Sequence, residues 1–346
     1  MEESFDKILV IQTAFIGDAI LTLPLIQALK RHYPNSSIDV IVAPRTAEIF
    51  AHHPAISKII QYDKRGRDKG IKGLRRMRNE LRTANYDLIL VPHRSLRSAF
   101  LTWLLHPSLS IGFDTSAGRW LFKRIVRYNP SFHEIERNLS LLSSLKLPIV
   151  AAELPRLYPS NQDVQILDSI MSADKVNSYK NIIALAPGTI WNTKRWPADR
   201  FAAVCQRVAS ENIAIVLLGG KEDEALCRHV TEIAQRKNVF NAAGKLTLLQ
   251  SAELIRRCKV LVSNDSAPMH IAVAMGTPVV AIFGATIPGF GFAPRGPRDI
   301  VVETNGLKCR PCSIHGGKTC PIKTFECMMA IDPEVVVSKL KLFINT

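Results

Sequence analysis

The sequence lacks the features that would carry a protein into or across a membrane. No stretch of its 346 residues reaches the roughly 18–20 apolar residues that a membrane-spanning helix requires. Residues 1–6 carry three acids and run directly into an apolar segment, without the basic region that opens a signal peptide. We therefore expect a cytoplasmic protein.

Acids are scarce relative to bases, and a dinucleotide-binding fingerprint is missing. There are 45 Lys and Arg against 30 Asp and Glu, a formal net charge of +15. This excess suits an anionic partner: nucleic acid, an acidic membrane surface or a phosphorylated substrate.

No G-x-G-x-x-G follows the first apolar run, so a dinucleotide-binding domain is not supported. A non-catalytic nucleic-acid or membrane binder is one alternative, although no RNA-binding signature with interleaved aromatics is evident.

Part of the positive charge is concentrated in residues 64–78. This segment holds eight Lys or Arg, among them Arg65, and its only acid is Asp68. Two interpretations remain open: the solvated face of a basic helix, or a surface that faces an anion.

Apolar runs alternate with helical patterns, which predicts an α/β protein with parallel sheets. The predicted strands are 7–12, 38–42, 88–91, 110–113, 182–186, 213–218, 260–263 and 279–283. A proline-containing stretch at 148–180 interrupts the rhythm, and the length favours more than one domain. We expect two Rossmann-like, doubly wound domains that face a cleft, 1–165 and 178–330, and a C-terminal helix in 331–346 that packs back on the first domain.

Unusual residues follow the predicted strands, where doubly wound sheets bind their ligands. Asp18 follows the first strand and is either a helix cap or a general base. In the second half, Lys194 and Arg195 suggest a diphosphate clamp, and Glu222 could accept hydrogen bonds from a ribose. The segment 264–270 opens a helix whose N-terminus could bind an anion, although its residues could equally be a cap and a core histidine.

Five motifs in order resemble those of the ADP-heptose:lipopolysaccharide heptosyltransferases, type II most closely, over nearly the whole chain. They are Gly-Asp-Ala-Ile-Leu-Thr-Leu-Pro (17–24), His-Glu-Ile-Glu-Arg-Asn (133–138), Thr-Lys-Arg-Trp-Pro (193–197), Leu-Gly-Gly-Lys-Glu-Asp (218–223) and Asn-Asp-Ser-Ala-Pro-Met-His (264–270). The resemblance implies glycosyltransferase family 9, a GT-B fold, inversion at the anomeric carbon and no required metal cofactor.

The same resemblance implies the reaction and its partners. The donor would be ADP-heptose, which gives L-glycero-D-manno-heptose to the inner core of lipopolysaccharide. The enzyme would act at the inner face of the inner membrane, as a peripheral protein without a nucleic-acid partner. A GT-B transferase with another nucleotide-sugar is the nearest alternative.

Site roles follow from the resemblance by position. Asp18 corresponds to the catalytic base, and Arg65, His133 and Arg137 are expected to face the acceptor. The expected donor-binding residues are Thr189, Lys194, Glu222, Asp265, Ser266, Ala267 and His270. Ala267 departs from the family pattern, where glycine is usual, and 284–288 replaces a commoner Gly-Pro-Thr turn.

Four of the seven cysteines are clustered near the C-terminus. Cys309, Cys312, Cys320 and Cys327 have intervals of two, seven and six residues. Four thiols at such intervals in a cytosolic protein suggest a structural zinc, with free thiols or reversible disulfides as the alternatives. The other three, Cys205, Cys227 and Cys258, are predicted to be buried small hydrophobes.

Overall fold

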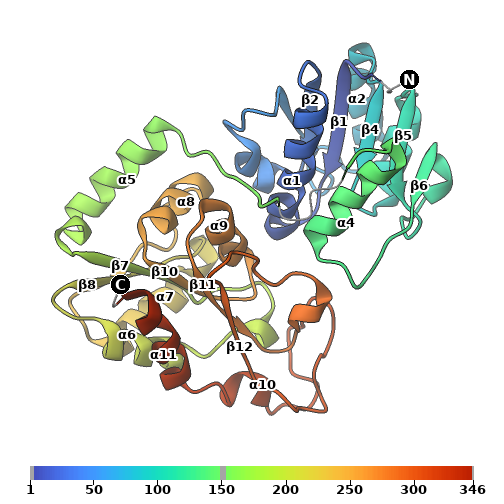
Figure 1. Ribbon diagram of the computed structural model, residues 1–346. Coiled ribbons are helices and arrows are strands. Elements are labelled where there is room, and N and C mark those ends of the chain that lie inside the picture. Colours follow the sequence, from blue (N-terminus) through green and yellow to red (C-terminus); the bar gives the residue numbers. More distant parts are fainter. Residues whose placement is uncertain (1–3, 149–152, 345–346) are drawn as a thin grey trace. The chain divides into compact units, whose positions relative to one another are not determined.

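The computed structural model describes residues 4–148 and 153–344, and it divides into two compact units (Figure 1). The units are Met1–Tyr158 and Pro159–Thr346. The described part of each unit contains one six-stranded parallel sheet. The predicted α/β class with two doubly wound sheets is therefore confirmed.

The first sheet has the strand order β3-β2-β1-β4-β5-β6. Its strands are β1 (Lys7–Gln12), β2 (Ser37–Val42), β3 (Lys58–Gln61), β4 (Leu88–Val91), β5 (Leu109–Phe113) and β6 (Arg124–Val126). The helices of this unit are α1 (Ile16–His32), α2 (Gly70–Leu81), α3 (Leu96–Leu104) and α4 (Glu134–Ser140). The central strands β1 and β4 are apolar on both faces and are buried, as expected for a parallel sheet covered by helices.

The second sheet repeats this topology in the order β12-β11-β10-β7-β8-β9. Its strands are β7 (Asn181–Ala186), β8 (Ile213–Leu217), β9 (Val239–Asn241), β10 (Val260–Asn264), β11 (Val279–Phe283) and β12 (Ile300–Glu303). The helices are α5 (Asn161–Ala173), α6 (Ala198–Val208), α7 (Glu224–Ala234), α8 (Leu248–Arg257), α9 (Ala267–Met275), α10 (Glu326–Met329) and α11 (Pro333–Ile344). Trp196 and Phe201 pack edge to face in its core, with ring centroids 5.0 Å apart.

Both sheets reverse their winding between two central strands, β1 and β4 in the first unit and β7 and β10 in the second. We call the carboxyl ends of β1 and β4 the first switch point and those of β7 and β10 the second switch point. The crevice at such a place is the usual ligand site of a doubly wound sheet. The candidate residues should therefore be sought after Gln12, Val91, Ala186 and Asn264.

One expected domain boundary differs from the structure. The first unit ends at Tyr158 rather than at 165, because α5 packs against α8 and belongs to the second unit. Helix α11 packs against α6, β11 and β12 of the second unit, where Val336 and Leu340 are fully buried. Its apolar face thus contributes to the core of the second unit, and the expected packing on the first domain stays a prediction. Within the described residues, no helix combines the length and apolarity needed to cross a bilayer.

Candidate active site

The first switch point holds a hydrogen-bonded cluster around Thr13, which follows β1. Thr13 Oγ1 lies 2.8 Å from Lys64 Nζ and 2.9 Å from Nδ1 of His93, a residue that follows β4. Lys64 Nζ also donates to Ser98 Oγ on α3 over 2.9 Å. One cation is therefore held among hydroxyl groups where the loops after β1, β3 and β4 meet.

Burial gives this cluster unusual ionisation. Burial first, and the nearby Arg97 second, together lower the pKa of Lys64 to about 7. Burial, followed by Lys64 and Arg94, lowers the pKa of His93 to about 4. His93 is therefore neutral at pH 7, so its Nδ1 can accept the Thr13 hydroxyl proton while Lys64 donates to the same oxygen.

Asp18 lies in the first turn of α1, close to the same strand end. Its Oδ2 accepts from Phe15 N over 3.2 Å, so this carboxylate does cap its own helix. Its charge also acts on two neighbours. Burial first, and Asp18 second, raise the pKa of Glu134 to about 7. Burial and Arg65 lower the pKa of Arg45, and Asp18 opposes this shift. Capping and a role in chemistry are compatible, because a carboxylate can accept several hydrogen bonds at once.

The two predicted acceptor residues at the start of α4, His133 and Arg137, are both buried. Arg137 is 4% exposed, and its guanidinium donates to the carbonyls of Asn129 and Pro130 and to Glu134 Oε2, the last over 3.0 Å. His133 is 5% exposed and caps the helix by accepting from Ile135 N over 3.2 Å. The predicted acceptor contacts of His133 and Arg137 stay predictions, and their burial favours a positioning role.

The second switch point is organised around Asp265, which follows β10. Lys194 Nζ and Thr286 Oγ1 each lie 2.6 Å from Asp265 Oδ2. The side chain of Asn264 accepts from Trp196 N over 3.0 Å and donates to the carbonyl of Pro187 over 2.8 Å. The loop after β7 and the loop after β10 are thus joined directly, with Lys194 at the junction.

Helix α9 begins immediately after this junction. Ser266 is its N-terminal flanking residue, and no side-chain hydrogen bond from Ser266 caps the helix. The first-turn N–H groups, starting at Ala267, and the positive end of the helix dipole therefore favour an anion at this place. His270 is 5% exposed, so the structure buries the imidazole.

The turn after β8 is predicted to bring Glu222 to the site, but it places the neighbouring Asp223 there instead. Glu222 is exposed, whereas Asp223 Oδ2 accepts from Gly220 N over 3.0 Å. A Cβ atom at Gly188 would lie 2.2 Å from Asp223 Cγ, so only glycine allows this approach. Asp223 therefore lies against the loop after β7, and burial raises its pKa. The ribose contact of Glu222 stays a prediction.

Arg195 and Thr189 lie on the same loop as Lys194. Arg195 Nη2 donates to the carbonyl of Thr189 over 2.8 Å. Its Nε is buried without a hydrogen-bond partner among the described residues. An unpaired buried guanidinium N–H is costly, which makes Arg195 a candidate ligand for an anionic group.

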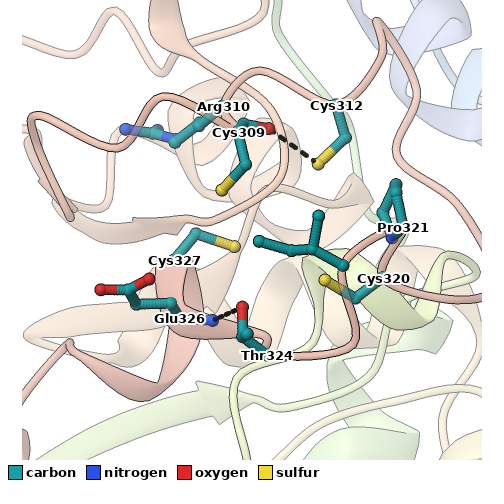
Figure 2. A pocket seen from close by; sticks show the side chains of 9 residues that line it. Cys309, Arg310, Cys312, Cys320, Pro321, Thr324, Glu326 and Cys327 are labelled. Carbon is teal, nitrogen blue, oxygen red and sulfur yellow. Dashed lines mark hydrogen bonds between the residues drawn. The ribbon is translucent and has the colours of Figure 1, made fainter.

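The four clustered cysteines line one cavity of about 20 Å³, enough for a single ion or water molecule (Figure 2). Their side chains come from the loop at 309–320 and from α10, and all four thiols are free. In residues 4–148 and 153–344, no three His, Cys, Asp or Glu side chains are already arranged to hold a metal ion. The structural zinc stays a prediction, and its binding would require the sulfurs to close to about 2.3 Å from the metal.

The cysteine-bearing loop is hydrogen-bonded to the loops of the second switch point. Gly317 N donates to Thr193 Oγ1 over 2.7 Å, and Thr193 N donates to the carbonyl of Gly317 over 3.0 Å. Cys312 N donates to the carbonyl of Ala285 over 2.9 Å. Arg310, whose side chain is 6% exposed, donates to the carbonyls on both sides of Ala285. The loop thus supports Lys194 and Thr286 from outside.

The residues that sequence reasoning missed follow the rule that located the others. His93 and Arg94 come directly after β4, and Asp223 comes after β8. Thr286 follows β11, the neighbour of β10. Reading every residue after a predicted strand would have identified them, whereas the pairing of Lys64 with Thr13 and Ser98 could be found only from the fold.

The chain is similar throughout its length to known glycosyltransferases. The model of "Glycosyltransferase family 9 (heptosyltransferase)" matches residues 74–323. Lipooligosaccharide heptosyltransferase 2 of Haemophilus influenzae is 26% identical, over 96% of this chain and 98% of that protein. Lipopolysaccharide heptosyltransferase 2 of Salmonella typhimurium is 28% identical, over 82% and 84% respectively.

Solved structures agree on the fold. A family 9 glycosyltransferase of Veillonella parvula has a TM-score of 0.86 at 24% identity, covering 100% of this chain and 99% of that one. The Escherichia coli structure titled ADP-heptose lps heptosyltransferase II has a TM-score of 0.80 at 23% identity, covering 98% of each chain. The predicted GT-B fold is thereby confirmed. Since the family model covers well over half of the sequence, the chain is a glycosyltransferase that belongs to family 9, the heptosyltransferases.

Proposed function

We propose that the protein transfers L-glycero-D-manno-heptose from ADP-heptose to the inner core of lipopolysaccharide. The curated relatives that match over most of their length carry the names of lipooligosaccharide and lipopolysaccharide heptosyltransferases. The observation that carries the proposal is the content of the two switch points. One holds a carboxylate beside several cations, and the other holds a lysine beside an uncapped helix N-terminus.

The first unit would supply the general base and the acceptor site. Asp18 would remove the proton from the acceptor hydroxyl as that oxygen attacks the anomeric carbon and ADP leaves from the opposite face. General-base assistance of this kind contributes about 10²–10⁴-fold to the rate. Arg45 and Arg65 beside Asp18, together with Lys64 at the end of the same sheet, would give this site a positive charge that suits phosphates and acidic sugars of an inner-core lipid.

The second unit would bind the donor. ADP leaves with its diphosphate carrying the developing negative charge, and Lys194 and the N-terminus of α9 would stabilise that charge. In the free protein Asp265 holds Lys194, so we propose that the diphosphate replaces the carboxylate as the partner of Nζ. A fixed lysine and backbone N–H groups would take the place of a metal ion, which is why we propose no metal cofactor for the reaction.

Because the proposed acceptor is a lipid, the enzyme would work as a peripheral protein at the cytoplasmic face of the inner membrane. The same charge that attracts this acceptor would also attract nucleic acid. We propose no role for nucleic acid, since a simple DNA or RNA binder would have no use for a carboxylate at the centre of its basic site.

A donor panel tests the proposal. The purified protein is incubated with heptose-deficient core lipid and with ADP-heptose, ADP-glucose, UDP-glucose or UDP-N-acetylglucosamine, and product is measured by mass spectrometry. We expect a lipid product that has gained one heptose, with ADP-heptose alone giving efficient transfer. Efficient transfer from a UDP-sugar, or steep salt-dependent binding to DNA without any transfer, would support one of the two alternatives instead.

A further inference from the structure

An apolar row lies on the outer face of α3 in the first unit. Leu96, Phe100 and Trp103 are 52%, 38% and 46% exposed. Their spacing of four and three residues places them on one side of the helix. The inner side of α3 is fully buried, for example at Ala99 and Leu101. The helix is therefore apolar on its solvent-facing side as well, which is unusual for a surface helix.

A second apolar segment adjoins this row. The 3-10 turn Arg119–Leu121 packs against α3, and its Trp120 is 72% exposed. The approach is close, because a Cβ atom at Gly118 would lie 2.8 Å from Leu96 Cδ1. We call the exposed side chains of Leu96, Phe100, Trp103 and Trp120 the α3 surface.

Cations flank the α3 surface at both ends of the helix. Arg97, at its start, donates to the carbonyls of Lys64, Asp68 and Gly70 and so ties α3 to the basic segment 64–78. There Ile71 is 71% exposed between the exposed Lys69 and Lys72. Past the other end, Lys123 Nζ donates to the carbonyls of Pro107 and Ser108 over 2.8 and 3.0 Å.

We propose that the α3 surface docks on the anionic headgroup layer of a lipid bilayer, with its aromatic and aliphatic side chains entering the boundary with the acyl chains. Tryptophan is favoured at that depth, and surrounding lysines are attracted by anionic lipids. The inference rests on the proposed function in one respect, namely that the acceptor is a membrane lipid.

Two other occupants fit the same observations less well. A second copy of the chain would bring like-charged flanks together, which is unfavourable. Single-stranded nucleic acid stacks its bases on free aromatic faces. The rings of Phe100 and Trp103 stack on each other with centroids 5.4 Å apart, so one face of each ring is already occupied. The aliphatic side chains of Leu96 and Ile71 would gain nothing from bases, whereas they would gain from acyl chains.

Docking at this surface would bring the membrane to the acceptor site. The inner side of α3 carries Ser98, which binds Lys64 Nζ in the cluster around Thr13. One short helix thus presents a membrane-binding face outward and a part of the acceptor site inward. A lipid-linked sugar would then reach the site without leaving the bilayer.

Vesicle flotation tests the proposal on the full chain. Vesicles contain phosphatidylcholine alone or mixed with phosphatidylglycerol, and a second set carries brominated acyl chains that quench nearby tryptophan. The variants are Trp103→Ser with Trp120→Ser, and Lys69→Glu with Lys72→Glu. The matched control is Leu342→Ser, an exposed apolar residue of α11 (60%) in the second unit. Thermal unfolding verifies that each variant is folded.

We expect the wild type and the control to float with phosphatidylglycerol vesicles and their fluorescence to be quenched by brominated chains. Each double variant should lose at least about tenfold in partition coefficient. Binding unchanged in the tryptophan variant, or no quenching in the wild type, would overturn the proposal. A wild-type dimer or RNA complex that is lost only in the tryptophan variant would identify another occupant of the α3 surface. That result would also overturn the proposal. Flotation needs no turnover, so its outcome is independent of the donor panel.

Discussion

The positive charge of Lys64 is disfavoured by the burial of its side chain and by the nearby Arg97. Its ammonium group donates to the hydroxyls of Thr13, Ser98 and, at 3.4 Å, Ser95, and no carboxylate lies within salt-bridge distance of it among the described ion pairs. Burial and Arg97 consequently lower its pKa to about 7. In the proposed function, an anionic group of the acceptor would supply the missing countercharge, and acceptor binding would then be coupled to pH through Lys64.

This coupling predicts a pH-dependent acceptor affinity. In the free enzyme Lys64 loses its proton as the pH rises through about 7, instead of 10.5, so its attraction for an anion is present below this pH and is lost above it. The acceptor KM should rise roughly fivefold to tenfold between about pH 7 and 8.5, the range over which a group of this pKa loses its charge. In Lys64→Arg the charge persists, and the profile should be flat. Steady-state kinetics at saturating donor measures this.

A second group could mimic that profile, because the pKa of Glu134 is also raised to about 7. Glu134→Gln is therefore the control, and it should keep the wild-type dependence of the acceptor KM. If Glu134→Gln flattens the profile and Lys64→Arg does not, the assignment to Lys64 is wrong.

Residues differ in how far the sequence alone can place them. Asp18, Lys194 and Asp265 could be located because they follow predicted strands, and a parallel sheet gathers such positions at one edge. Lys64 lies within a run of eight cations, and neighbouring sequence cannot say which of them turns inward. That choice depends on hydroxyls 51 and 34 residues away.

At the scale of elements, the central strands were predictable and the edge strands were not. Strands β3, β6, β9 and β12 have three or four residues and lie at the sheet edges, where part of each strand is exposed. Each of these strands has only two or three consecutive apolar residues, which is too short a run to identify a strand. The helix starts of α5 and α8 do carry a sequence signal, because Ser160 and Thr247 are residue types that cap helices. In the structure each hydroxyl accepts from the N–H three residues later.

The loop between β12 and α10 should act on donor binding through Thr193. Thr193→Val keeps the volume and removes the hydroxyl that accepts from Gly317 N, leaving a partly buried N–H without that partner. We expect a loss of about 1 kcal/mol in unfolding free energy and about a fivefold rise in donor Kd, with the acceptor KM unchanged. Urea unfolding and ADP calorimetry measure these effects. The matched control Thr231→Val, on α7, should lose stability without changing donor Kd.

The same loop gives the zinc prediction its test. If the four thiols of Figure 2 close around zinc, protein purified without chelators should contain about one equivalent of metal by elemental analysis. Cys309→Ser should lose it. Less than about a tenth of an equivalent in the wild type would exclude a structural zinc and leave free thiols or reversible disulfides as the alternatives.

At the scale of the whole molecule, the net charge of +15 predicts that salt affects acceptor binding and donor binding to different extents. The groups assigned to the acceptor include the exposed Arg45 and Arg65, whereas Lys194 is 12% exposed in its ion pair. Exposed charges are screened by salt more than buried ones. Raising the salt should therefore increase the acceptor KM severalfold and change the donor KM much less. Equal salt effects on both constants would contradict this assignment of the two sites.

The repeated strand order shows why the fold as a whole could be predicted while the domain boundary could not. Each apolar run and helix pattern reports its own neighbourhood, and their alternation is enough to define two doubly wound sheets. The boundary depends on which sheet α5 packs against, and the placement of α11 depends on where its apolar face finds a core. Both are matters of long-range packing that local pattern does not contain.

The most direct test of the whole account is the turnover of Asp18→Asn with ADP-heptose and core lipid. Asparagine keeps an oxygen that can accept from Phe15 N, so the helix cap should survive, but it is no longer a base. We predict a fall in kcat of about 10²–10⁴-fold, while calorimetry gives an unchanged donor Kd. A kcat within about threefold of the wild type would contradict the assignment of Asp18 as the base that activates the acceptor.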